Sequence, residues 1–200
     1  MIRRAYIQNQ ILRIFHGMNN ISFPINLDDV ASLMPTSCRL LSYQTAAKIS
    51  GCKVDAIYSM CGSSSGATHY HPQTGRCLIL YNESQPDGRV LWTQAHELGH
   101  VALEHLCMVN SHPTKDRWQY QLFEDEADFF AWNLLAPLPI MREYGIQNAK
   151  QVQKRFGLSK QAADLHFARY VRWERRHIKT AWENDLVRIF RQKQIKVGAS

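Results

Sequence analysis

The apolar residues near the amino terminus recur at helical spacing. A first amphipathic helix is predicted over residues 2–15, ending near Gly17, with four apolar side chains on one face: Ile7, Ile11, Ile14 and Phe15. In the stretch FPINLDDVASLM, Asn26 can cap a short second helix whose apolar side chains point inward: Leu27, Val30, Ala31 and Met34. Residues 1–35 are therefore expected to form an N-terminal helical segment.

Short apolar runs in the next part of the chain predict a small sheet. The stretch CRLLSY is typical of one strand, and ATHYHPQTGRCLILYN is typical of a hairpin whose arms flank Pro72–Gly75. The second arm, Cys77–Tyr81, is nearly all apolar, as expected of a strand that is covered on both faces. Between these strands a helix is predicted over Thr45–Met60, with Gly51 inside it.

The second half of the chain is predicted to be helical. One helix is expected over about Arg89–Cys107, after Asp87 as its N-cap, and another over Trp118–Leu135, where the prolines of APLP stop it. Two more helices follow, and Gly157 ends the first of them. The predicted fold class is therefore α+β, with a small mixed or antiparallel sheet near residues 38–82 beside a larger helical part.

Composition and charge set outer limits on the function. Apolar residues make up 45% of the 200 positions, enough for one sizeable core, and the net charge of +7 favours acidic or polyanionic partners. The first residues lack a continuous apolar segment, and no apolar run reaches the roughly 18–20 residues of a membrane span. Five cysteines without a C-x-x-C pair are typical of reduced thiols. We therefore expect a soluble, cytoplasmic protein with no membrane partner.

The stretch QAHELGH, residues 94–100, carries the main chemical signal. On a helix, His96 and His100 lie on one face about 5–6 Å apart, so their imidazole nitrogens can bind one cation. Neutral imidazoles suit Zn²⁺, which in a catalytic site takes three protein ligands and keeps a fourth position for water. Glu97 lies at the edge of the same face, where its carboxylate can serve as general base and acid. The H-E-x-x-H pattern therefore predicts a zinc hydrolase site.

The third ligand does not follow the pattern of the metzincins. Their motif would require Gly at position 103 and His at position 106, where this chain has Leu103 and Leu106. His105 is one place away from the required position. The metzincin class is therefore excluded, and the third ligand is expected further along the chain.

The acidic stretch FEDEADFFAWNLLAP offers the better candidate. Glu124 begins a helical stripe that continues with small and acidic residues: Ala127, Asp128, Ala131 and Leu135. The alanines let this helix approach the first one, so Glu124 can reach the metal while Asp128 accepts the second N–H of a ligating histidine. Glu126 is the alternative ligand, about 200° around the helix from Glu124. We prefer Glu124 because only its stripe has alanine and aspartate behind it.

Three segments together resemble one family. HELGHVALEH, EDEADFFAWNLLAP and VQKRFGLSKQAADLHFARY are similar to the ImmA/IrrE family of gluzincin-type zinc metallopeptidases, over about residues 40–170. The resemblance implies that His96, His100 and Glu124 bind the metal and that Glu97 is catalytic. It also implies cleavage of a helix-turn-helix repressor, which derepresses genes of a mobile element or of a stress response. The bulky Trp132 is a departure from the family that is expected to alter the cleft.

Two further parts of a peptidase site stay open in the sequence. The oxyanion of the transition state needs a hydrogen-bond donor, and Tyr120, His166 and His177 are all available. The stretch Ala67–Tyr70 is a candidate edge strand for binding a substrate by backbone pairing. The sequence does not choose among the three donors.

The carboxy-terminal part supports a different hypothesis. RFGLSKQAADLHFARY has the helix, turn and helix order of a DNA-binding motif, and basic residues dominate from Lys150 to Lys196. Against DNA binding, its apolar residues are expected in the core: Phe156, Leu158, Ala162, Leu165 and Phe167. The alternative function is a non-hydrolytic zinc-containing regulator that binds DNA or a protein partner through this basic half.

These patterns predict a single domain over residues 1–200. It would comprise N-terminal helices (1–35), a catalytic core (36–140) and a basic, helical C-terminal extension (141–200). The predicted function is a regulatory zinc-dependent endopeptidase with a protein substrate.

Overall fold

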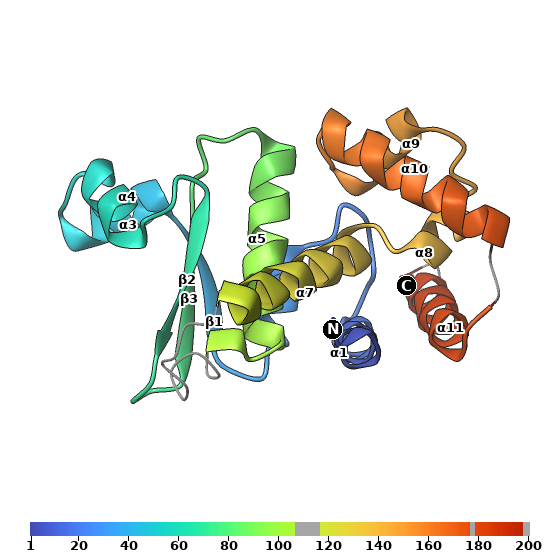
Figure 1. The fold of residues 1–200 in the computed structure, drawn as a ribbon, viewed down its shortest axis with the longest axis horizontal. Coiled ribbons are helices and arrows are strands. Elements are labelled where there is room, and N and C mark those ends of the chain that lie inside the picture. The colour runs from blue at the N-terminus through green and yellow to red at the C-terminus, as the bar shows by residue number, and fades with distance from the viewer. Residues whose placement is uncertain (107–116, 177–178, 198–200) are drawn as a thin grey trace.

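The structure is a computed structural model that describes the backbone of residues 1–106, 117–176 and 179–197. Helices dominate it and a small three-stranded sheet lies toward one end, so the predicted α+β class is confirmed (Figure 1). None of the described helices is both long and apolar enough to cross a membrane. The proposed division into a single domain with three segments stays a prediction.

The N-terminal segment contains the two predicted helices. Helix α1 (Arg4–Gly17) buries the apolar face that its spacing indicates, and it packs against helices of the second half of the chain. Helix α2 (Leu27–Ser32) begins where the Asn26 side chain accepts hydrogen bonds from the backbone N–H groups of Asp28 and Asp29. Both helices contribute to the main hydrophobic core.

The sheet is mixed, with strand order β1-β3-β2. Strand β1 (Cys38–Ser42) runs parallel to β3 (Arg76–Tyr81), while β2 (Gly66–His71) runs antiparallel to β3 and forms the predicted hairpin with it. The central strand β3 buries apolar side chains, as its composition predicts. Among the described strands, β2 pairs only with β3, so its other edge is open to a further strand.

One predicted helix is two helices in the structure. Helix α3 (Tyr43–Ser50) ends at Gly51, which has a φ of 67°, and α4 (Val54–Cys61) begins after a short turn. The prediction of a continuous helix over residues 45–60 is therefore wrong. The reason is that glycine adopts the left-handed conformation without steric cost and ends a helix there.

Helix α5 (Asp87–Ala102) carries the H-E-x-x-H motif and is shorter than predicted. Pro86 occupies the N-cap position and Asp87 lies in the first turn, so the predicted capping by Asp87 is wrong. The helix ends before Glu104, whose φ of 60° lies in the left-handed region and turns the chain away from the helix axis. The predicted end at Cys107 and the interruption at residues 112–114 lie outside the described residues.

The remaining helices complete the core. Helix α7 (Arg117–Leu135) packs against α5, and α8 (Leu138–Glu143) begins within APLP, with Pro137 at its N-cap and Pro139 in its first turn. Helices α9 (Ala149–Phe156) and α10 (Lys160–Arg176) are separated at Gly157, as predicted, and α11 (Ala181–Val197) packs against α1. Figure 1 shows α8 to α11 on the side of α5 that lies away from the sheet.

Candidate metal centre

The candidate metal centre lies where α5 and α7 approach most closely. A side-chain carbon on Gly99 would lie 3.1 Å from the Cα of Ala127 and 3.2 Å from its carbonyl oxygen, so only glycine fits without a shift of the neighbouring helix. Ala127 is fully buried in the same contact. The small residues therefore let the two backbones touch, and this brings the acidic part of α7 beside the histidines of α5.

Three predicted ligands converge at this contact. The Nε2 atoms of His96 and His100 lie 3.1 Å apart, and the Glu124 carboxylate lies 3.3 Å from the first and 3.5 Å from the second. One ligand atom from each residue lies within 4.8 Å of the other two. In a tetrahedral zinc site with bonds of about 2.0–2.1 Å, neighbouring ligand atoms are about 3.3–3.4 Å apart. The three side chains therefore have the spacing that a zinc ion requires.

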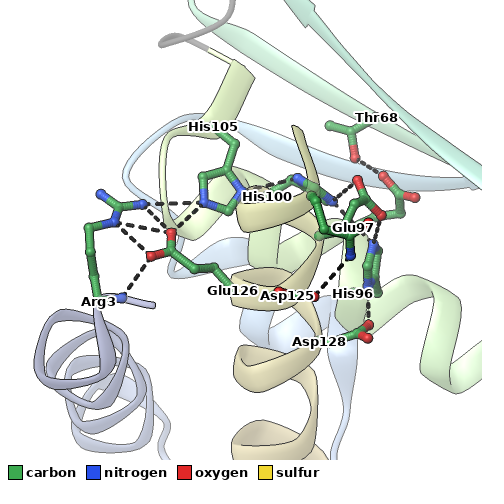
Figure 2. A network of polar contacts seen from close by, with 11 residues as sticks. Arg3, Thr68, His96, Glu97, His100, His105, Asp125, Glu126 and Asp128 are labelled. Atoms are coloured by element: carbon green, nitrogen blue, oxygen red, sulfur yellow. Dashed lines mark hydrogen bonds and ion pairs between the residues drawn. The ribbon is translucent and has the colours of Figure 1, made fainter. Parts of the chain in front are cut away.

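Asp128 supports the first histidine. Its Oδ1 lies 2.9 Å from the Nδ1 of His96, one helical turn beyond Glu124 (Figure 2). An ionised carboxylate can only accept a hydrogen bond, so the His96 Nδ1 carries a proton. In the neutral form of His96, which is the form that binds a metal, the lone pair is then on Nε2, the atom that faces His100 and Glu124. This is the contact expected of Asp128, and it fixes the tautomer that binds a metal.

The pKa values of the two histidines are shifted in opposite directions. Burial opposes the charged form of His96, but hydrogen bonds with Asp128 and Glu124 raise its pKa to about 9. Burial and the neighbouring imidazoles lower the pKa of His100 to about 3. The hydrogen bond with His96 lowers the pKa of Glu124. Glu124 is therefore ionised at neutral pH, which a metal ligand requires.

Glu97 lies between the ligands and the sheet. Its Oε2 accepts a hydrogen bond of 2.6 Å from the hydroxyl of Thr68 on β2 (Figure 2). Burial raises the pKa of Glu97, and the hydrogen bond from Thr68 opposes this. A carboxylate with a raised pKa holds and releases a proton more readily near neutral pH, as general acid and base catalysis requires.

A comparison with protein families agrees with this geometry. The family model of the IrrE N-terminal-like domain, a peptidase family, matches residues 53–167, which is more than half of the chain. The chain belongs to this family. The family match includes the H-E-x-x-H helix α5 and the acidic helix α7, which are two of the three segments that carry the resemblance in the sequence. A search of curated proteins gave no match.

Glu126, the alternative ligand in this IrrE N-terminal-like domain, points away from the candidate metal centre. Glu126 is fully buried, and its carboxylate contacts Arg3 and His105. Figure 2 shows it on the side of α7 away from His96. Glu124 and Glu126 therefore lie on different faces of α7, as the helical period predicts. Glu124 is the carboxylate that faces both motif histidines.

Sequence reasoning missed three contacts of the site. Thr68 lies within the stretch that was expected only to bind a substrate. Side chains alternate between the two faces of a strand, and this alternation indicates which face of β2 Thr68 occupies. His105 appeared only as a residue one place away from a metzincin ligand. Arg3 is 123 residues from its partner Glu126, and no local pattern indicates that contact.

The structure separates the candidate donors for the oxyanion. His166 is buried at 3% exposure, with its Nε2 2.6 Å from the carbonyl oxygen of Ala136 and its ring stacked on Trp132. It is therefore not available to a substrate. Tyr120 is exposed on α7 and shares a hydrogen bond with Glu124, whereas His177 lies outside the described residues. Tyr120 is the described candidate that lies at the metal centre.

The buried His166 leads to a prediction for the stability of the zinc-free protein. Burial lowers its pKa to about 4, and its Nδ1 has no hydrogen-bond partner among the described residues. The unfolded chain, with a pKa of about 6.5, therefore binds the proton first as the pH falls. We expect the free energy of unfolding to lose about 2 kcal/mol through this group between pH 7 and pH 5.

The measurement is urea unfolding of wild type and His166→Gln at both pH values. The glutamine amide can still donate to Ala136 but does not titrate. The drop in stability should be smaller in the variant by about that amount. An equal drop in both proteins would mean that His166 does not contribute.

Proposed function

We propose that this protein is a zinc-dependent endopeptidase of regulatory type, with His96, His100 and Glu124 as the metal ligands. The proposal rests above all on the convergence of two Nε2 atoms and one carboxylate at 3.1 to 3.5 Å, with Glu97 alongside. The membership in a peptidase family supports hydrolysis of a peptide bond rather than of another substrate. When bound, Zn²⁺ would lower the pKa of a water and polarise the peptide carbonyl.

Glu97 is proposed as the general base and then the general acid. Its carboxylate would take the proton of the attacking water and return it to the leaving amine. Thr68 orients this carboxylate through its hydroxyl, at 2.6 Å from Oε2, and through a backbone hydrogen bond. The hydroxyl of Tyr120, on the helix turn before Glu124, is the proposed donor to the oxyanion.

The edge strand β2 is proposed to bind the substrate. Its outer edge is unpaired among the described strands, and Thr68 connects this strand directly to Glu97. A peptide that pairs with β2 by backbone hydrogen bonds would therefore run in extended form past the catalytic carboxylate. This arrangement requires an unfolded or flexible segment in the substrate, because a folded helix has no free backbone groups to pair.

The proposed substrate is a helix-turn-helix repressor or a similar regulatory protein. This part of the proposal rests on the resemblance to the ImmA/IrrE family. The test is co-expression of the protein with a helix-turn-helix repressor encoded beside its gene. Appearance of repressor fragments with wild type, and not with Glu97→Gln, would support the proposal. An intact repressor in both would reject this substrate.

Asp128 is proposed to hold His96 for the metal, and its removal gives a testable loss of affinity. We expect Asp128→Ala to weaken zinc binding by about tenfold, the lower end of the usual 10–100-fold effect, because its side chain is 54% exposed and its charge is screened. The matched control is Asp125→Ala, since Asp125 contacts Gln121 on the exposed side of α7. Competition with a fluorescent chelator measures both affinities, and equal losses would contradict the assigned role.

The basic C-terminal half gives less support to the alternative of a DNA-binding regulator. Several of its arginines are engaged within the protein, as in the contacts of Arg142 with Glu174 at 2.7 Å and of Arg191 with Glu143 at 2.6 Å. Phe156 and Leu158 are buried as predicted, so the turn between α9 and α10 is part of the core. Leu165 is an exception, because it is 56% exposed and the prediction that it is buried is wrong.

A further inference from the structure

The second histidine of the motif has a buried partner of its own. The Nδ1 of His100 lies 3.1 Å from the Nδ1 of His105, and the Nε2 of His105 lies 3.1 Å from the Oε2 of Glu126. Figure 2 shows these side chains in a row that leads from the metal centre to the start of α1. The row lies on the opposite side of the ligands from Asp128.

Glu126 is held at the far end of this row by Arg3. The backbone N–H of Arg3 donates to Oε1 at 2.8 Å, and its guanidinium donates to Oε2 at 2.6 Å. The carboxylate thus lies at the amino-terminal end of α1, where the helix dipole also favours a negative charge. The side chain of Arg3, the N-cap residue of α1, makes no capping hydrogen bond. The Glu126 carboxylate of α7 caps this helix end instead.

The direction of the hydrogen bonds follows from the carboxylate. Glu126 can only accept, so the Nε2 of His105 carries the proton and donates to it. The Nδ1 of a neutral His105 is then an acceptor, and the Nδ1 of His100 must donate to it. A neutral His100 with its proton on Nδ1 has its lone pair on Nε2, which is the atom that faces His96 and Glu124.

The opposite direction would block the site. The Nη2 of Arg3 lies 3.3 Å from the same Nε2 of His105 and could donate to it if that nitrogen were unprotonated. His105 would then carry its proton on Nδ1 and donate to His100. The proton of a neutral His100 would move to Nε2, which could no longer bind a metal. The shorter contact of Nη2 is with Glu126, at 2.6 Å, and this favours the first direction.

We propose that Arg3, Glu126 and His105 are positioning residues that set the tautomer and orientation of His100 for metal binding. His105 suits this role because it is buried at 1% exposure and its ring is stacked on Phe123 at 4.3 Å, so it cannot rotate away. The inference deepens the proposed function and rests on its metal site. Through Arg3, the site depends on how the first residues of the chain are docked.

Two substitutions of His105 separate positioning from packing. The amide oxygen of asparagine lies near the place of Nδ1 and can accept from His100, whereas the amide nitrogen of glutamine lies near the place of Nε2 and keeps only the contact with Glu126. Both remove the ring that stacks on Phe123. We expect His105→Gln to weaken zinc binding by about 10–100-fold and His105→Asn to weaken it clearly less.

A second pair of variants tests the N-terminal end of the row. Arg3→Gln should weaken zinc binding by about tenfold, because Glu126 loses its guanidinium partner. Arg4→Gln is the matched control, since Arg4 is the next residue and lies over the ring of Phe129. Its zinc affinity should equal that of wild type. All affinities are measured by chelator competition, so none depends on an identified substrate.

Nitrogen-15 NMR of the histidine rings in the zinc-free wild type gives an independent readout. A proton on Nε2 of His105 and on Nδ1 of His100 is expected, and Arg3→Gln should alter this pattern. The reverse tautomers, or equal zinc affinity in wild type, Arg3→Gln and both His105 variants, would overturn the inference. Absence of zinc binding in wild type would instead reject the proposed function, so the two failures are distinguishable.

Discussion

Replacement of Glu97 by glutamine is expected to lower hydrolysis of the proposed repressor substrate by about 10²–10⁴-fold while zinc stays bound. Glutamine keeps the shape of the side chain and can still accept the hydrogen bond from Thr68, but it cannot take a proton from water. Glu97 contributes no ligand atom to the proposed metal site, so the affinity for zinc should change little. Cleavage rate and zinc content are measured on the same preparations.

The control for this prediction is Glu104→Gln. Glu104 is exposed and lies just beyond the end of α5, and it is not among the proposed ligands. The substitution therefore removes the same charge and leaves the ligands and Glu97 in place, although Glu104 interacts electrostatically with Arg3. Its activity should match that of wild type. Full activity of Glu97→Gln would contradict the enzymatic role proposed for the motif. Loss of zinc from this variant would indicate that Glu97 is a metal ligand and not a general base.

Replacement of Glu124 by alanine is expected to have the largest effect on zinc itself. It removes one of the three proposed ligand atoms, and the loss of affinity should exceed the roughly 100-fold upper range that is typical of residues which only support a ligand. Hydrolysis should be lost at the same time, because the proposed activation of water depends on the ion. Chelator competition and zinc content measure the effect.

Asp125→Ala serves as the control for Glu124→Ala as well, since it changes the neighbouring carboxylate on the exposed side of α7. The comparison with Glu126→Ala decides between the two candidate ligands. Glu126 contacts His105 and Arg3, so its removal should cost less affinity than the removal of Glu124. A larger loss from Glu126→Ala would reverse the ligand assignment.

The sequence predicted the parts of the fold and site that depend on local spacing. The interval between His96 and His100 places both on one helix face, and the stripe from Glu124 to Asp128 indicates which face of α7 meets them. The hairpin and the existence of a further strand also follow from short apolar runs around turn residues, whereas the parallel pairing of β1 with β3 does not. These features need only the period of a helix or a strand, which is the information that local sequence carries.

The missing parts depend on backbone conformations and on distant contacts. The left-handed conformation of Glu104 is rare for a residue with a side chain, and it follows the helix end that brings His105 back to His100. The contact of Arg3 with Glu126 joins residues that are 123 positions apart. This contact arises from the packing of α1 against α7. The periodic spacing of apolar residues indicates which face of a helix is buried, but it does not specify which helix packs against that face.

The contact between Gly99 and Ala127 has a consequence for the lifetime of a bound ion. The proposed ligands belong to two long helices whose backbones touch, and neither helix can move aside without opening the hydrophobic core. The backbones that carry the proposed ligands are therefore held in place before an ion arrives, and a bound ion would be released by rotation of a ligand side chain, such as the partly exposed Glu124, without separation of the helices. An ion bound by residues of both helices would also link α5 to α7, and it would raise the free energy of unfolding because the unfolded chain does not form the site.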